Sequence, residues 1–120
     1  MAIQKILICD DSETDLANLV IALQSTQCTV ITAGNGDEVV KKARAEQPDI
    51  IFMDIIMPGT DGFAACRELR DHPATQNIPV IFVSSRSQKA DRVWAIMQGA
   101  KDLVAKPFQP AEITKLLASF

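Results

Sequence analysis

Short apolar segments alternate with longer segments of helical period along the whole chain, and this alternation restricts the possible folds more than any other feature. The apolar segments have the length and the β-branched content of strands. The segments between them repeat an apolar residue every three or four positions, as amphipathic helices do. We predict strands at 5–9, 28–32, 49–53, 79–83 and 102–105, and helices at 15–25, 36–45, 62–70, 89–98 and from Pro110 onward.

Strict alternation of strands and helices predicts an α/β fold in which a parallel sheet is covered by helices on both faces. The strands are almost fully apolar, as expected where both faces of a sheet are buried. The chain has 120 residues, of which 48% are hydrophobic, so it can form one domain with its own core. We therefore expect a single domain over residues 1–120, with no output domain.

Charge and cysteine content exclude several classes of protein. The net charge is -3 with both signs intermixed, so we expect neither nucleic-acid binding nor a membrane surface as partner. The N-terminal segment is too briefly apolar for a signal peptide, and no apolar run has membrane-spanning length. Cys9, Cys28 and Cys66 fit no zinc pattern and are expected to be reduced, mostly buried thiols of a cytoplasmic protein.

Polar residues follow the carboxyl ends of the predicted strands, where open parallel sheets bind their ligands. Asp10 and Asp11 follow the first strand, Asp54 the third, Ser84 the fourth and Lys106 the fifth. Each has an ordinary explanation when taken alone, such as a helix cap for the acidic pair or a loop position for the serine. Because all of them fall at the same edge of the sheet, we predict that they form one site.

The chemistry of this set points to phosphoryl transfer. Carboxylates gathered at one place repel one another unless a cation offsets their charge, and their hard oxygens suit Mg²⁺, with Mn²⁺ as an alternative. Lys106 can hold one phosphoryl oxygen, and Ser84 can donate a hydrogen bond to another. Asp54 is then the candidate nucleophile, since carboxylates form aspartyl-phosphates.

These residues resemble the motifs of the response-regulator receiver family, which includes CheY-like single-domain regulators. The resemblance spans the chain and rests on Asp10-Asp11, on 53–59 with Asp61-Gly62, on Ser84 and on 106–108. It implies a doubly wound, five-stranded sheet of order 2-1-3-4-5 with five helices. It also implies a signalling protein rather than an enzyme, although receivers promote their own phosphorylation and autodephosphorylation.

The resemblance assigns roles to single residues. It makes Asp54 the phosphorylation site, and it makes Asp10, Asp11, Asp54 and the backbone carbonyl of Ile56 the ligands of Mg²⁺. Ser84 matches the switch hydroxyl, and Lys106 matches the lysine that pairs with the phosphoryl group.

Three further positions carry expectations from the same resemblance. The bond from Lys106 to Pro107 is expected to be cis. Ile56 and Arg86 match the positions that tune autodephosphorylation, and the apolar Ile56 predicts a moderately slow loss of the phosphoryl group.

Two features distinguish this chain from the commonest receiver pattern. Leu103 stands where most receivers have a switch aromatic, so we expect coupling by packing alone, or a role as a phosphate sink. Val93-Trp94 and the run 98–102 look like the pilus-motility branch of single-domain regulators, the PilH type. Trp94 is then either a partly buried packing residue of the fourth helix or part of a partner surface.

The leading hypothesis is a stand-alone response regulator of two-component signalling, in chemotaxis or type IV pilus motility. A histidine kinase would be the phosphodonor, and the face of the fourth helix, fifth strand and fifth helix would bind a protein target. The regulator would be a monomer or a weak dimer. The alternatives are a phosphorelay intermediate or a phosphate sink. An aspartyl-phosphate phosphatase is disfavoured because Ile56 stands where such enzymes carry a second acid, and a flavodoxin-like carrier is disfavoured because Asp10 and Asp11 would repel a flavin phosphate.

Overall fold

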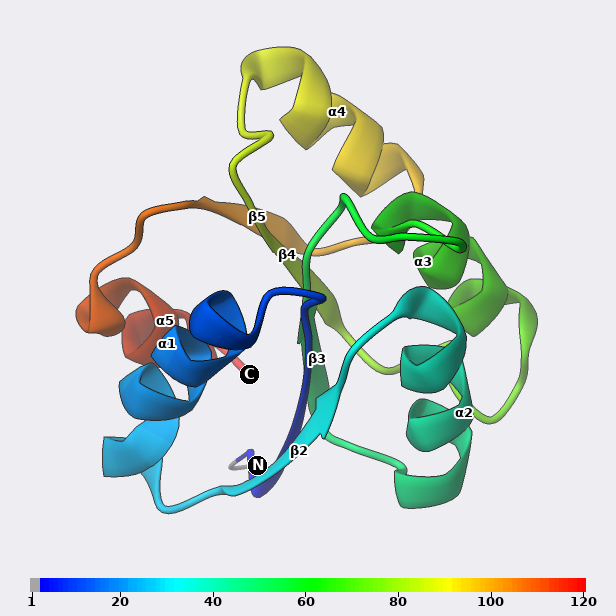
Figure 1. Cartoon of the computed structure of the whole chain (residues 1–120). Coiled ribbons are helices and arrows are strands. Elements are labelled where there is room, and N and C mark those ends of the chain that lie inside the picture. The colour runs from blue at the N-terminus through cyan, green and yellow to red at the C-terminus, as the bar shows by residue number, and fades with distance from the viewer. Residues whose placement is uncertain (1–2) are drawn as a thin grey trace.

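The computed structural model describes residues 3–120 and contains one five-stranded parallel sheet (Figure 1). The strand order is β2-β1-β3-β4-β5, which confirms the predicted α/β class and topology. Adjacent strands pair in parallel along the whole sheet, with Leu7 of β1 opposite Ile31 and Ile51 of its two neighbours. The strands are β1 (Lys5–Cys9), β2 (Thr29–Ala33), β3 (Ile50–Met53), β4 (Val80–Ser84) and β5 (Asp102–Ala105).

Helices cover both faces of the sheet, with α1 and α5 packed on one face and α2 and α3 packed together on the other (Figure 1). α4 lies beside β5, at the far edge of the sheet from β2. None of the helices in residues 3–120 has the length and hydropathy needed to cross a membrane. The helices are α1 (Glu13–Leu23), α2 (Gly36–Glu46), α3 (Gly62–Asp71), α4 (Lys89–Met97) and α5 (Pro110–Leu117), with a short 3-10 turn at Gln24–Thr26.

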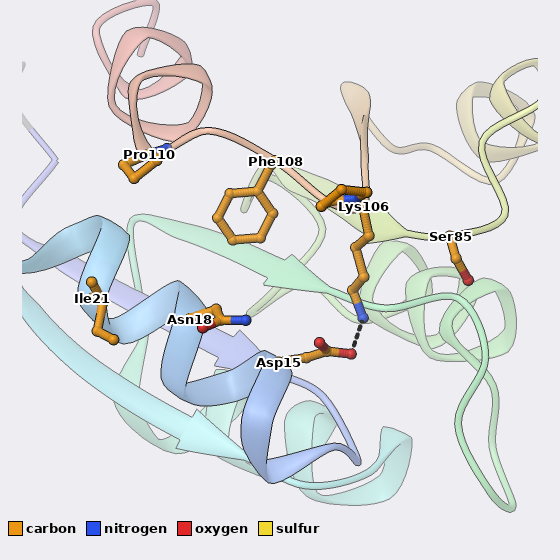
Figure 2. A pocket seen from close by; sticks show the side chains of 8 residues that line it. Asp15, Asn18, Ile21, Ser85, Lys106, Phe108 and Pro110 are labelled. Atoms are coloured by element: carbon orange, nitrogen blue, oxygen red, sulfur yellow. Dashed lines mark hydrogen bonds and ion pairs between the residues drawn. The ribbon is translucent and has the colours of Figure 1, made fainter.

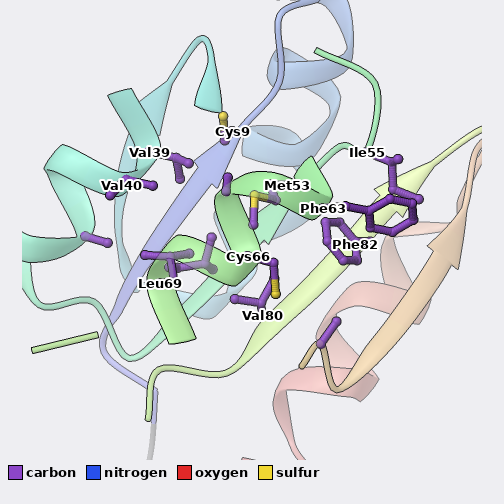
Figure 3. Close-up of a cluster of buried hydrophobic side chains, with 14 of the residues drawn as sticks. Cys9, Val39, Val40, Met53, Ile55, Phe63, Cys66, Leu69, Val80 and Phe82 are labelled. Carbon is purple, nitrogen blue, oxygen red and sulfur yellow. The ribbon is translucent and has the colours of Figure 1, made fainter. Parts of the chain in front are cut away.

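Successive residues of each central strand enter two different cores. In β1, Leu7 and Cys9 pack on the α2–α3 side, whereas Ile6 and Ile8 pack on the α1–α5 side. The same period of two continues in β3 and β4, because strand side chains point alternately to opposite faces. Figure 3 shows the α2–α3 core, where helix side chains such as Leu69 meet the strands. Both faces must therefore be apolar, which explains the near-continuous apolar strands.

Most predicted elements lie within two residues of the observed ones, and the start of α1 differs for a specific reason. We predicted that this helix begins at residue 15, but it begins at Glu13. Ser12 is its N-cap, and the Ser12 side chain accepts a hydrogen bond from the backbone N–H of Asp15. Asp15 is therefore a first-turn residue, and its side chain lies at the N-terminal end of the helix, close to the loop that follows β1.

α4 departs from the pattern of an ordinary amphipathic helix. Val93, Ile96 and Met97 form its apolar pattern, yet all three are more than half exposed, and Trp94 is 50% exposed. Only Ala95 of this helix is buried. Periodicity identified the helix but not the side that faces the core, and the buried side of α4 uses a single small residue.

Gly62 fixes the loop that carries Asp54. Its backbone N–H donates to the carbonyl oxygen of Ile55 at 2.7 Å, which joins the start of α3 to the end of β3. A Cβ at Gly62 would overlap the carbonyl oxygen of Asp54 and approach the Cα of Ile55 to 2.8 Å. Close approach of two backbone segments is one of the situations in which glycine is required.

We predict that Gly62→Ala lowers the free energy of unfolding by about 2 kcal/mol, because the added methyl group forces the backbone of Asp54 and Ile55 to move. Urea unfolding followed by circular dichroism measures the change. Gly34→Ala is the matched control, since a Cβ there meets nothing within 4 Å, and it should change stability by less than about 0.5 kcal/mol. Equal stabilities for the two variants would contradict the prediction.

Candidate phosphoacceptor site

The candidate site lies at the carboxyl ends of the central strands. Asp10 directly follows β1, Asp54 directly follows β3, Ser84 ends β4, and Lys106 directly follows β5. β1 and β3 are neighbours in the sheet although β2 lies between them in sequence, so this is the point where the strand order reverses. Ligands of open α/β sheets bind at such a switch point.

The ammonium group of Lys106 connects three carboxylates. Its Nζ lies 2.8 Å from Asp10 Oδ2, 2.8 Å from Asp15 Oδ2 and 2.7 Å from Asp54 Oδ2. An ammonium has three N–H donors, so each carboxylate receives one of them. These distances are typical of charge-assisted hydrogen bonds. The residues come from three separate regions of the sequence, and Lys106 therefore ties the strand ends to α1.

Asp54 has its two oxygens in different environments. Oδ1 accepts the backbone N–H groups of Ile55 at 2.7 Å and Ile56 at 3.3 Å, and Oδ2 accepts Lys106. Its side chain is 11% exposed, so the carboxylate is mostly enclosed but still reachable from solvent. The backbone donors hold one oxygen in place, and the other faces the lysine in a position where it could react.

The Asp10 carboxylate is the most deeply buried of the three, with 1% of its side chain exposed. Oδ1 accepts the backbone N–H of Ser12 at 3.0 Å, and Oδ2 accepts Lys106. Burial raises the pKa of Asp10 above its ordinary value, and the bonds from Lys106 and Ser12 offset only part of this effect. Burial alone would lower the pKa of Lys106, but the carboxylates around it raise that pKa well above the ordinary value.

Asp15 is the residue of this cluster that the sequence analysis missed. We treated it only as the start of a helix, whereas its carboxylate contacts Lys106 as closely as Asp10 does. Asp11, which was expected to bind the metal, is exposed on the loop and is not part of the group of carboxylate oxygens formed by Asp10, Asp15 and Asp54. The available signal was the Ser12 cap, which sets the first turn of α1 and so the place of Asp15.

The remaining expected site residues lie on β4, on β5 and in the loops that follow β3, β4 and β5. Ser84 is fully buried, and its Oγ accepts the backbone N–H of Arg86 at 3.1 Å. The Arg86 guanidinium contacts Asp91 of α4 at 3.1 Å and lies 6.0 Å from the centre of the Phe63 ring. The side chain of Ile56 is 53% exposed, and Leu103 is buried at 3%. The peptide bond between Lys106 and Pro107 is cis.

The donor set fits a divalent cation. One oxygen from each of Asp10, Asp15 and Asp54 lies within 4.8 Å of the other two, and all are hard carboxylate ligands of the kind that Mg²⁺ takes. Three carboxylates face a single lysine, so the cluster has excess negative charge that a second cation would offset. Cys9 directly precedes Asp10, and burial raises the pKa of its thiol to about 12, so it stays protonated and is a poor ligand.

Comparison with known proteins agrees with this geometry. The sequence profile of the response regulator receiver domain matches residues 6–118. The protein PilH of Pseudomonas aeruginosa is 42% identical over 113 residues, which cover 94% of this chain and 93% of PilH. The chain belongs to the response regulator receiver family. The response regulator PleD of Caulobacter vibrioides is 38% identical over 86% of the chain, which corresponds to 23% of PleD.

Solved receiver structures share the fold over nearly the whole chain. The chemotaxis protein CheY4 of Vibrio cholerae has a TM-score of 0.90 at 27% identity, covering 98% of both chains. The receiver domain of a sensor histidine kinase from Pseudomonas aeruginosa has a TM-score of 0.89 at 30% identity, covering 98% of this chain and 97% of its own. That crystal structure contains a magnesium ion coordinated in the active-site cleft. The chain is thus a receiver domain of a signalling protein family, and a related receiver binds Mg²⁺.

We predict that Asp10→Asn stabilises the metal-free protein at neutral pH by about 1 kcal/mol, because it removes a buried charge while Lys106 keeps two carboxylate partners. The folded state binds the Asp10 proton more tightly than the unfolded chain does. Protonated Asp10 therefore costs the wild-type fold nothing below the ordinary pKa of 3.8. As the pH rises through the raised pKa, Asp10 becomes charged and the wild-type protein loses stability. The advantage of the variant should disappear in acid.

Urea unfolding in EDTA, at neutral pH and near pH 4, measures both effects. Asp11→Asn is the control: it removes the same charge from an exposed neighbour and should change stability by less than about 0.5 kcal/mol. A destabilised Asp10→Asn protein at neutral pH would show that the ion pair with Lys106 outweighs the cost of burying the charge.

Proposed function

We propose that this receiver accepts a phosphoryl group from a histidine kinase on Asp54 and acts as a stand-alone response regulator. The observation that carries this is the 2.7 Å contact between Lys106 and Asp54, beside the buried hydroxyl of Ser84. These groups supply an enclosed carboxylate nucleophile and donors for a phosphoryl group. The 93% coverage of PilH supports action as a single receiver domain.

The proposed reaction uses Asp54 as the nucleophile. A carboxylate oxygen of Asp54 forms a bond to phosphorus as the bond between phosphorus and the donor nitrogen breaks, and that nitrogen keeps the electron pair. Lys106 donates to a phosphoryl oxygen, and Ile55 and Ile56 hold Oδ1 through their N–H groups. A cation held by Asp10, Asp54 and the Ile56 carbonyl would supply further positive charge against the phosphoryl oxygens, and Asp11, the fourth expected ligand, would have to turn in from the exposed loop to join them.

Ser84 is the proposed switch residue. Its Oγ now accepts the N–H of Arg86, and turning it toward a phosphoryl group would release that N–H. Arg86 is in turn paired with Asp91 in the first turn of α4, so the release would be transmitted to this helix. Leu103 stands in place of an aromatic residue and has no hydroxyl, so we infer that the movement of Ser84 is transmitted through the packing of the buried Leu103 side chain.

We infer that the output surface includes the apolar side chains of α4. Trp94 is 50% exposed, which favours the partner-surface interpretation over the packing one. The neighbouring exposed apolar residues of the helix are Val93, Ile96 and Met97. The proposed target is a protein that contacts the face of α4, β5 and α5, and the proposed location is the cytoplasm.

The similarity to PilH supports a role in type IV pilus motility, with chemotaxis as the related alternative. The sequence at residues 93–94 and 98–102, which looks like the PilH type, supports the same role. A phosphorelay intermediate or a phosphate sink would use the same site. Transfer of the phosphoryl group to a purified histidine phosphotransfer protein identifies the relay. A terminal regulator instead shows phosphorylation-dependent binding to a target.

We predict that acetyl phosphate with Mg²⁺ adds a single phosphoryl group to the wild-type protein, and that Asp54→Asn abolishes the addition because the amide is not a nucleophile. Intact-mass spectrometry measures the adduct, with EDTA in a parallel sample. Asp61→Asn is the control, because Asp61 caps α3 outside the cluster. An adduct on Asp54→Asn would place the phosphorylation elsewhere.

We predict that Ile56→Asn shortens the lifetime of the phosphorylated protein several-fold. The exposed apolar side chain of Ile56 offers no group that orients an attacking water, whereas an amide does. The decay of the phosphorylated mass after removal of the donor gives both rates, and Ile56→Leu should decay like the wild type. Identical decay of the Asn and Ile proteins would rule out a role for this position.

A further inference from the structure

The ammonium group of Lys106 occupies the carboxylate oxygens that a divalent cation would require. Nζ contacts Asp10 Oδ2 at 2.8 Å and Asp54 Oδ2 at 2.7 Å. The buried Asp10 has its other oxygen on the N–H of Ser12, and Asp54 has its other oxygen on the N–H groups of Ile55 and Ile56. A cation and an ammonium on the same oxygens repel each other strongly in an enclosed site. Metal binding therefore requires Lys106 to give up part of these contacts.

Asp15 offers the acceptor that Lys106 then needs. Its Oδ2 lies 2.8 Å from Nζ, and its side chain is 39% exposed, against 1% for Asp10 and 11% for Asp54. It projects from the first turn of α1 toward the lysine, and both residues line an open cleft of about 560 Å³ (Figure 2). The ammonium can therefore shift to the solvent side of the cluster and still keep Asp15 as a carboxylate partner.

We propose that Asp15 is a positioning residue that holds Lys106 away from Asp10 and Asp54 while these two carboxylates bind the divalent cation. This inference rests on the proposed metal-assisted phosphorylation. Asp15 lowers the cost of exchanging the ammonium for the cation on the inner oxygens. Without it, Lys106 depends on Asp10 and Asp54 alone and competes more effectively with the metal.

Glu13 allows this role to be separated from two general effects of an acidic residue. Glu13 and Asp15 are both acidic residues of the first turn of α1, so each interacts favourably with the helix dipole and each adds negative charge near the site. Glu13 is exposed, and within residues 3–120 the lysine makes its ion pairs with Asp10, Asp15 and Asp54 and not with Glu13. Glu13→Gln thus removes an equivalent charge but leaves the Lys106 contacts intact.

The experiment is a calorimetric titration of the intact, unphosphorylated protein with MgCl₂. Asp15→Asn should weaken Mg²⁺ binding by roughly twofold to fivefold, the range expected from loss of one partly exposed ion pair. Glu13→Gln should change the Kd less than about twofold, and Asp15→Glu should restore part of the affinity. In a Lys106→Gln background, Asp15→Asn should have no larger effect than Glu13→Gln, because no ammonium remains to be held.

Phosphorylation by acetyl phosphate at increasing Mg²⁺ gives a second measurement. Asp15→Asn should raise the Mg²⁺ concentration for half-maximal rate by the same factor and leave the rate at saturating Mg²⁺ within about twofold of the wild type. A purely structural role would lower the plateau without changing the half-saturation point.

The outcomes separate this inference from the function on which it rests. Wild-type protein that binds Mg²⁺ with the same Kd as Asp15→Asn, or an equal effect of Glu13→Gln and Asp15→Asn, would overturn the role of Asp15 and leave the proposed function standing. Wild-type protein that binds no Mg²⁺ would overturn the metal-assisted function and this inference together.

Discussion

One ammonium shared by three carboxylates is the interaction on which the site depends. Lys106 reaches Asp10, Asp15 and Asp54 within 2.7 to 2.8 Å, and so balances charges that would otherwise repel one another in a poorly hydrated place. The balance is incomplete, because burial still raises the pKa of Asp10. A site left with excess negative charge is prepared to accept positive charge, and the same lysine is then available for an incoming phosphoryl group.

The packing of the sheet brings these carboxylates and the lysine together. Period-two alternation gives each central strand a core on both faces, which fixes the register of β1 against β3 and hence the positions of Asp10 and Asp54. Gly62 then lets α3 start close against the backbone of Asp54. Apolar packing therefore sets the backbone position of Asp54, and Lys106 then holds its carboxylate.

The strands and the grouping of Asp10, Asp54, Ser84 and Lys106 could be predicted because they follow from local patterns and from a general property of parallel sheets. The contact of Asp15 with Lys106 could not, since it joins residues 91 positions apart and depends on the residue at which α1 begins. Asp11 shows the converse: adjacency to Asp10 in sequence does not bring it into the cluster, because neighbouring residues leave a strand in different directions. The exposed side chains of α4 escaped prediction because periodicity does not reveal which side a helix buries.

α4 keeps only Ala95 buried, so very little apolar area holds this helix on the domain. Its attachment depends more on polar contacts, because Arg86 pairs with Asp91 and Arg92 with Asp102 of β5 in its first half. Gln98, just after its last residue, accepts hydrogen bonds from Cys66 and Arg67 of α3. Local opening free energies follow buried contacts, so α4 belongs to the low-stability end of the molecule, where segments detach and reattach without unfolding of the rest. A small change at the β4–α4 loop can therefore shift α4 between the positions that it populates.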